Sequence, residues 1–450
     1  MVSDILPEAL DLLRNHSSPD ALVNSNARFD PPQCKFSTRR AIIQHIEDWA
    51  NDGNMPADIF WLKGGAGVGK SAVAQTLAEM YQRNERLAAS FFFFRAAPSR
   101  SDGNTLIPTL VFQLIRAFPG LKVHVEDKIR SSQNQLFFTR RQDQTVDLLL
   151  EPFHRLALQD HAIDDVSYPR PRLIIIDGLD ECSDPDVQCD LLRIIAGAAF
   201  HLPYPLRFFI TSRPESHITQ TFDHHPDLQA IKVHRYNLSD DPDADHDIRE
   251  FLLKEFQEIR RVHRLRHRLP PDWPSETAID SLVERSSSHF IYASTVVRYI
   301  KSPRHRPDDR LQVVLGLLPR PGNDQPYAQL DALYSLIFLG LEEDRREVIR
   351  IIFGILYLRS EQVDLGVQSA SNIESIVLLL SMRPGDLELL FDPLVSLVVI
   401  DDDIEILHKS LFDYLVDPIR SGPFIDLPLS HGSVALSMAT QIRRLNKICE

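Results

Sequence analysis

The chain has 450 residues, of which 43% are hydrophobic and 25% are charged, and its formal net charge is −14. A chain of this length predicts roughly two to four domains. The acidic balance provides no overall positive field for nucleic acid or for an anionic membrane, so we expect neither as a partner.

The cysteines and the N-terminus predict a cytoplasmic setting. The four cysteines form no CxxC pair, and no set of cysteines and histidines has the spacing of a zinc site. The N-terminal stretch MVSDILPEALDLLRN lacks the basic region of a secretory signal. No apolar run approaches the roughly 20 residues that a membrane-spanning helix requires. We therefore expect a soluble protein in a reducing compartment.

The N-terminal segment, residues 1–37, predicts a short helix followed by a linker. Leucines recur at helical spacing near its start, and a pair of prolines excludes a helix towards its end. Thr38 is then expected to cap a helix over residues 39–50, which carries its apolar residues on one face.

Five short apolar runs predict the strands of an α/β domain over residues 38–238. The runs are continuous rather than alternating, which is typical of parallel strands covered by helices on both faces. The expected strands are 59–64, 88–94, 172–177, 206–212 and 230–238.

Beyond Leu238 the pattern becomes largely helical. Helices are expected over 247–265, 277–288 and 290–300. Prolines mark expected linkers at 304–310 and 318–326. Two apolar runs that flank Asp401–Asp403 then predict a β-hairpin followed by a helix.

A basic run, RRVHRLRHR at 260–268, overlaps the end of the first of these helices. It has no interleaved aromatic residues and belongs to an acidic protein. We therefore interpret it as a solvated helix face or a contact between domains, and not as a nucleic-acid site.

The segment GGAGVGKS at 64–71 matches the pattern G-x-x-x-x-G-K-[ST], between an expected strand and an expected helix. Gly64, Gly67 and Gly69 are expected to adopt backbone angles closed to other residues, so that main-chain N–H groups converge on a phosphate. Lys70 can reach the β- and γ-phosphates of a nucleotide, and the Ser71 hydroxyl can bind Mg²⁺. A chance glycine-rich turn is the alternative, which the strand and helix on either side disfavour. The candidate nucleotide-binding residues are Gly64, Gly65, Ala66, Gly67, Val68, Gly69, Lys70 and Ser71.

The segment LIIIDGLDE at 173–181 ends a buried strand in three acidic residues. Asp177 lies at the carboxyl end of this strand, where a carboxylate linked to Mg²⁺ belongs if the sheet sets it beside the glycine-rich loop. Asp180 and Glu181 follow directly and are suited to orient an attacking water. The alternative is an ordinary acidic surface turn.

The segment FFITSRPES at 208–216 places Thr211 and Arg213 at the end of the next strand. Because neighbouring strand ends face one crevice in this architecture, Arg213 can touch the γ-phosphate and report its presence. An arginine that is merely exposed at the end of a strand is the alternative.

With these three blocks in order, the chain resembles the NACHT family of STAND NTPases, and within it the fungal proteins with a nephrocystin-like N-terminal region. The resemblance covers about residues 28–420 and rests on the order of seven segments. These are RFDPPQCKFSTR (28–39), WLKGGAGVGKSAVAQTLAE (61–79), LIIIDGLDECSD (173–184), FFITSRPESHI (208–218), FIYASTVVRYI (290–300), YAQLDALYSLI (327–337) and ILHKSLFDYLVD (406–417).

The resemblance implies an ATP/ADP-binding switch with Mg²⁺, in which several domains close over ADP and open on exchange to ATP. It implies a P-loop nucleotide-binding domain over 38–238, a helical domain over 239–322 and a winged-helix-like domain over 323–425. A further helical segment or tail is expected over 426–450. Larger members carry an N-terminal effector and C-terminal repeats, so this sequence is a short member, a fragment or a mispredicted gene product.

The resemblance also implies roles for single residues. His408 matches a histidine that such proteins direct at the β-phosphate of ADP, and Arg39 is expected to line the adenine pocket. A packed histidine at the end of the hairpin is the alternative for His408. The segment SSSHFIY (286–292) lacks the Gly or Pro that related proteins often carry there.

Three functions follow as hypotheses. The first is a signalling switch with slow ATP hydrolysis, in nonself recognition or cell death, with protein partners or a homo-oligomer in the ATP state. The second is a stand-alone P-loop enzyme, either a kinase or a ring-forming ATPase, although neither an arginine-rich lid nor an arginine finger is evident. The third is a scaffold that binds nucleotide without hydrolysing it.

Overall fold

The computed structural model divides the chain into two compact units. The first unit comprises Met1–Cys34, Arg39–Gly65 and Gly69–Asp240, and the second comprises Lys35–Thr38, Ala66–Val68 and Asp241–Glu450. The structure describes residues 9–421 apart from 29–30, 36–37, 52–56, 96, 133–134, 160–171, 317–326, 361–372, 374–375, 378–379, 381, 384, 395–396, 401–402 and 407. The predicted linker at 318–326 and the predicted segment 426–450 lie outside the described residues.

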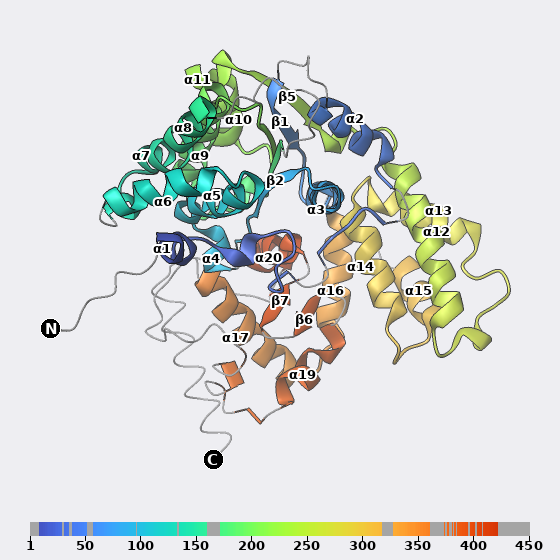
Figure 1. Cartoon of the computed structure of the whole chain (residues 1–450). Coiled ribbons are helices and arrows are strands. Elements are labelled where there is room, and N and C mark those ends of the chain that lie inside the picture. The colour runs from blue at the N-terminus through green and yellow to red at the C-terminus, as the bar shows by residue number, and fades with distance from the viewer. Residues whose placement is uncertain are drawn as a thin grey trace. The chain divides into compact units, whose positions relative to one another are not determined.

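The first unit is built on a five-stranded parallel sheet, which confirms the predicted α/β fold (Figure 1). Its order is β2-β3-β4-β1-β5. The strands are β1 (Ala57–Lys63), β2 (Leu87–Phe92), β3 (Leu173–Asp177), β4 (Arg207–Ser212) and β5 (Lys232–Asn237). Each lies within three residues of its predicted bounds. All the carboxyl ends therefore lie at one edge of the sheet.

Both faces of this sheet are buried because successive side chains of a strand point to opposite sides. Ile59 and Trp61 of β1 belong to one large apolar cluster, together with residues of α5 (Leu106–Ala117) and α9 (Pro185–His201). Phe60 points the other way and contacts Trp49 of α2 (Arg40–Asn51), with ring centroids 5.3 Å apart. This explains why β1 to β4 are largely apolar, whereas the edge strand β5 carries exposed and half-buried polar residues.

The start of α2 differs from the prediction. Thr38 does not cap the helix: its hydroxyl donates to the carbonyl of Lys35 at 2.9 Å. Arg39 has a φ of +60°, which is incompatible with a right-handed helix, so α2 begins one residue later at Arg40.

The N-terminal segment packs onto the first unit. Leu13 of α1 (Ala9–Asn15) is fully buried, and so is Ala21. The Ser18 N–H donates to the Thr109 hydroxyl at 2.8 Å, and the Val23 N–H donates to the Ser90 hydroxyl at 3.3 Å on β2. This segment therefore packs against α5 and β2.

Further helices complete the first unit, several of them near α5 and α9 (Figure 1). They are α3 (Lys70–Arg83), α4 (Pro98–Ser101), α6 (Leu121–Ser131), α7 (Arg141–Thr145), α8 (Glu151–Gln159), α10 (Ser216–His224) and α11 (Pro226–Ala230).

The second unit is mainly helical, as predicted. Its helices are α12 (Ala244–Val262), α13 (Glu276–Ser286), α14 (Phe290–Lys301), α15 (Pro307–Leu315), α16 (Ala328–Leu339), α17 (Glu343–Ser360), α19 (Asp386–Phe391), α20 (Lys409–Val416) and α21 (Pro418–Ser421). The predicted hairpin is present as the antiparallel pair β6 (Val398–Ile400) and β7 (Ile404–Ile406), and α20 follows it.

Two boundaries in the second unit differ from the prediction. The helix expected over 247–265 ends at Val262, and part of the basic run forms a separate short helix at Arg266–Arg268. The linker expected over 304–310 becomes helical at Pro307, because proline suits the first turn of a helix and Asp308 and Asp309 favour its positive end.

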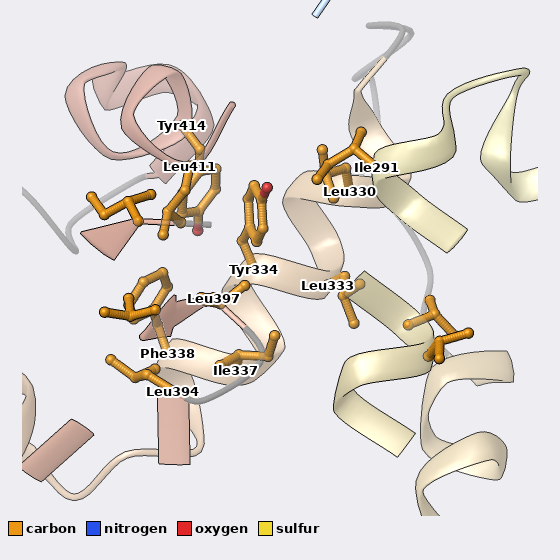
Figure 2. Packing of buried hydrophobic residues seen from close by; sticks show 14 of the residues in the cluster. Ile291, Leu330, Leu333, Tyr334, Ile337, Phe338, Leu394, Leu397, Leu411 and Tyr414 are labelled. Carbon is orange, nitrogen blue, oxygen red and sulfur yellow. The ribbon is translucent and has the colours of Figure 1, made fainter. Parts of the chain in front are cut away.

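Helix α16 lies at the centre of the apolar core of the second unit. In Figure 2, Tyr334 and Phe338 lie on the side of α16 that faces α20, where Tyr334 and Tyr414 have ring centroids 5.2 Å apart. Leu330 lies beside Ile291 of α14. Within the part of the chain that the structure describes, no helix is both long and apolar enough to cross a membrane.

Candidate phosphate-binding site

The glycine-rich loop connects β1 to α3, as predicted. Gly67 and Gly69 have positive φ angles, +78° and +103°, which residues with a Cβ rarely adopt. Gly64 does not have a positive φ, so the expectation for that glycine was wrong. The first helical residue of α3 is Lys70, and the positive end of the helix dipole therefore lies at the loop.

The ammonium group of Lys70 is held against the loop. It donates to the carbonyls of Gly64 and Gly65, both at 2.8 Å. The Gly65 N–H donates to the hydroxyl of Ser239, which follows β5, at 2.9 Å. These bonds fix the first half of the loop and keep the positive charge beside it.

Asp177 lies at the carboxyl end of β3 and contacts residues from two other elements. Thr211 of β4 donates to its carboxylate at 2.6 Å and accepts from the Gly178 N–H at 2.9 Å. The Ser71 hydroxyl is also hydrogen-bonded to Asp177. The structure thus brings the two predicted metal ligands together.

Burial raises the pKa of the Asp177 carboxyl group above its ordinary value. The hydrogen bonds from Thr211 and Ser71 oppose this shift, as do the charges of Arg28 and Lys70. The arrangement fits a Mg²⁺ ion, because a hydroxyl and a carboxylate are oxygen ligands of the kind that this ion prefers. A bound cation would also favour the ionised form of this buried acid.

The acidic turn after β3, which contains Asp180 and Glu181, is hydrogen-bonded to neighbouring segments. Asp180 is 2% exposed. Its carboxylate accepts from the Arg213 N–H at 3.0 Å and lies 3.4 Å from Nε of the same residue. The structure therefore joins Asp180 to the arginine that the sequence predicts as a sensor, whereas the next residue, Glu181, is half-buried.

Arg95 also reaches this turn, and the sequence interpretation missed it. Its guanidinium donates to the carbonyl of Asp180 at 3.0 Å, and its N–H donates to the Glu181 carboxylate at 3.3 Å. Arg95 follows the apolar run that forms β2. The reasoning that selected Arg213 at the end of β4 could have identified it, because the ends of parallel strands meet at one edge.

Arg39 is buried in the first unit, at 3% exposed, with the positive φ described above. Its Nε atom makes no hydrogen bond to the described residues, whereas the residue has other contacts. A strained backbone and a buried donor atom are features that accumulate at ligand sites.

The middle of the glycine-rich loop, Ala66–Val68, groups with the second unit. Within that unit, the Gly67 carbonyl accepts from the Ile291 N–H at 3.2 Å, and the Ala66 N–H donates to the Tyr327 hydroxyl at 3.2 Å. A Cβ on Gly67 would lie 2.2 Å from Cγ2 of Ile291. The loop therefore has no room for a side chain at this glycine.

His408 precedes α20 and caps it. Its Nδ1 accepts from the Ser410 N–H at 3.1 Å, so in the neutral ring the proton is on Nε2. The Ser410 hydroxyl bonds both Nδ1 and the Tyr334 hydroxyl, at 2.8 Å each. These bonds fix the orientation of the imidazole ring.

Residues 37–213 match the family model described as Nephrocystin 3, N-terminal. The match spans the glycine-rich loop, Asp177 and the acidic turn, and it ends at Arg213. The matched segment thus contains every candidate residue except His408.

No curated protein matches the chain. Among solved structures, one match is a chain of "Structure of Drosophila ORC bound to poly(dA/dT) DNA and Cdc6 (conformation 1)", at 11% sequence identity and a TM-score of 0.30. The alignment covers 99% of this chain and 66% of that one. We draw no functional conclusion from so distant a likeness.

Proposed function

We propose that the protein binds ATP and ADP with Mg²⁺ and works as a cytoplasmic signalling switch of the NACHT type. The observation that carries this proposal is a glycine-rich loop whose lysine is held against it, in a sheet whose strand β3 ends in the buried carboxylate of Asp177. Such a set of groups supplies N–H donors, an ammonium group and oxygen ligands, which a magnesium-bound triphosphate requires.

Each residue has a role in this proposal. Lys70 holds the β- and γ-phosphates, and Ser71 and Asp177 hold Mg²⁺, which neutralises phosphate charge when it is bound. Glu181 orients the attacking water, whereas Asp180, whose carboxylate is bound by Arg213, positions that arginine as the γ-phosphate sensor. Arg39 contacts the adenine.

The second unit supplies the mechanical response in this proposal, with residues 239–322 as a helical domain and 323–425 as a winged-helix-like domain. The hairpin β6–β7 followed by α20 supports the second assignment. His408 directs Nε2–H at the β-phosphate of ADP, and the bonds to Ser410 support this by fixing its ring.

A nucleotide shifts a conformational equilibrium only by its difference in affinity for the two states. Full switching requires roughly 5.5 kcal/mol. Contacts made only to the γ-phosphate, by Lys70, Mg²⁺ and Arg213, favour one state in the proposal, and the contact between His408 and ADP favours the other. Slow hydrolysis then resets the switch.

The acidic turn favours a stand-alone ATPase as a second candidate, because Arg95 donates to Glu181 and Arg213 binds the neighbouring Asp180. The two candidates differ in rate. Steady-state turnover above about 1 per second is typical of kinases and would favour an enzyme, whereas a switch turns over more slowly.

The switch is tested by identifying the bound nucleotide and by measuring the oligomeric state of the protein with ADP and with an ATP analogue. We expect purified protein to release ADP on denaturation. We also expect its molecular mass by light scattering to rise when a non-hydrolysable ATP analogue replaces ADP. His408→Ala should weaken ADP binding but not binding of the analogue. An identical mass in both states, with both nucleotides bound, would contradict the switch and favour the scaffold.

A further inference from the structure

Arg95 lies beside the acidic turn because β2, which precedes it, pairs with β3, which precedes the turn. Phe92 is paired with Asp177 in the parallel register of β2 and β3. One residue later, the Phe93 N–H donates to the Asp177 carbonyl at 2.9 Å. The chain that leaves β2 is therefore tied to β3 up to two residues before Arg95.

Arg95 binds two successive residues of the turn with two different groups. Its guanidinium donates to the carbonyl of Asp180 at 3.0 Å, and its main-chain N–H donates to Oε2 of Glu181 at 3.3 Å. Hydrogen bonds that involve an ionised group are stronger than neutral ones. These contacts restrain both the backbone of the turn and the carboxylate of Glu181.

The turn is held from the opposite side as well. Arg213, after β4, binds both carboxylate oxygens of Asp180. Inside the turn, the Glu181 N–H donates to the Gly178 carbonyl at 2.7 Å, and the Cys182 N–H donates to the Leu179 carbonyl at 3.1 Å. The acidic turn is therefore clamped between the ends of β2 and β4.

We propose that Arg95 is a positioning residue that sets the Glu181 carboxylate for catalysis. The inference rests on the proposed function, because it needs a bound ATP. In the step, the oxygen of a water attacks the γ-phosphorus and the bond from that phosphorus to the bridging oxygen of ADP breaks. Glu181 accepts the proton of the water, and ADP and inorganic phosphate are the products. Such a step is sensitive to misplacement of the accepting group, since an error of 1 Å can cost about a hundredfold in rate.

Arg100 offers a matched control on the same segment. Its guanidinium donates to the carbonyl of Phe92 at 3.2 Å and lies 4.9 Å from the centroid of the Phe94 ring. These contacts restrain the segment after β2. Arg100→Ala therefore reports what the loss of one arginine does to the local fold.

The first readout needs no nucleotide. In hydrogen exchange of nucleotide-free protein, we expect Arg95→Ala to speed exchange of the Glu181 and Cys182 amides about tenfold or more, because local opening of the turn becomes easier. Arg100→Ala should leave these amides unchanged. Arg95→Lys should restore part of the protection, since an ammonium group can still donate to the carbonyl of Asp180.

The second readout is single-turnover hydrolysis with the affinity for ADP measured in parallel. We expect Arg95→Ala to lower the hydrolysis rate about ten- to a hundredfold and to leave the affinity for ADP within about twofold. Arg95→Lys should recover part of the rate.

Five outcomes would contradict either the positioning role of Arg95 or the function on which it rests. Unchanged exchange or an unchanged rate in Arg95→Ala would overturn the positioning role, and so would an equal effect of Arg100→Ala. A wild-type protein that binds ADP but never hydrolyses ATP would overturn this inference and leave nucleotide binding intact. A wild-type protein that binds no nucleotide would overturn the proposed function itself.

Discussion

Asp177 is almost completely buried, at 4% exposed, and in the proposed site the ionisation of its carboxyl group affects cation binding beside Ser71. Burial is the largest cause of its raised pKa, and the bonds from Thr211 and Ser71 offset only part of that cost. Burial therefore disfavours the ionised carboxylate of Asp177, and a cation that binds here must stabilise it.

This predicts a pH dependence for magnesium. As the pH falls through the raised pKa, Asp177 takes up a proton and loses its affinity for Mg²⁺. We therefore expect Mg²⁺ to strengthen ADP binding less as the pH is lowered, so that the ratio of ADP affinities with and without Mg²⁺ declines. This loss should begin at a higher pH than it would for an aspartate with an ordinary pKa. Titrations of fluorescent ADP across the acidic range, with wild type and Asp177→Asn, measure this ratio. A ratio that stays constant until the protein unfolds would contradict the prediction.

The raised pKa of Asp177 also predicts how the unfolding free energy of the metal-free protein changes with pH. The unfolded chain ionises Asp177 at a lower pH than the folded protein does. Stability should therefore decrease as the pH rises from the ordinary aspartate range to the raised pKa. In urea unfolding of metal-free protein, Asp177→Asn should remove this part of the pH profile. A profile identical to that of wild type would show that the carboxyl group is not titrating as inferred.

Thr211 links the ends of β3 and β4 and gives a third prediction at this scale. Thr211→Val removes the donor to Asp177 and the acceptor of the Gly178 N–H, so we expect a loss of about 1–3 kcal/mol in unfolding free energy. Thr211→Ser should recover most of it. Thr221→Val is the control, because that hydroxyl donates to the His217 carbonyl one turn earlier in α10 and so makes a bond within its own helix. Equal losses at Thr211 and Thr221 would refute a special role for Thr211.

At the scale of elements, α1 tests whether the N-terminal segment is part of the first unit. Leu13 is fully buried within the apolar cluster of that unit, whereas Leu12 is half-buried. We expect Leu13→Ala to lower the unfolding free energy by about 2–5 kcal/mol and Leu12→Ala to have a clearly smaller effect. Urea unfolding of the full chain measures both. If neither change matters, the segment is not integral to the core.

The strands and the glycine-rich loop could be predicted from the sequence because the residues within each segment largely determine its structure. Continuous apolar runs predicted β1 to β4, since these strands are buried on both faces. Strand β5 was also predicted, although its residues are exposed or half-buried at the edge of the sheet. The glycine-rich loop was predictable because its pattern sets both its backbone and the helix that follows. The first turn of α2 was not, since a positive φ at Arg39 follows no local rule for an arginine.

Candidate residues were harder to predict where they depend on strand order. The apolar run of β2 could have placed Arg95 at the same edge of the sheet as the acidic turn. Nothing local indicates that β2 lies beside β3, so its contacts with Asp180 and Glu181 could not be predicted. The order of the sheet, which places β4 between β3 and β1, likewise joins Thr211 to Asp177. Asp180 was expected at an attacking water, but its bonds to Arg213 depend on that same order.

At the scale of the whole molecule, the account depends on nucleotide binding by the first unit. The central claim is that the loop at 64–71 and Asp177 together hold a magnesium-bound adenine nucleotide. Lys70→Met removes the ammonium group at the loop and leaves a side chain of similar length. Lys63→Met is the matched control, because the Lys63 ammonium lies 5.1 Å from the centroid of the Trp61 ring, at the end of β1.

Calorimetric titration of nucleotide-free, folded protein with ADP and Mg²⁺ tests this claim most directly. We predict saturable heat for wild type and for Lys63→Met. For Lys70→Met and Asp177→Asn we predict an affinity lower by at least about tenfold, which corresponds to 1.4 kcal/mol. No heat with the folded wild-type protein, or equal binding by Lys70→Met, would contradict the account.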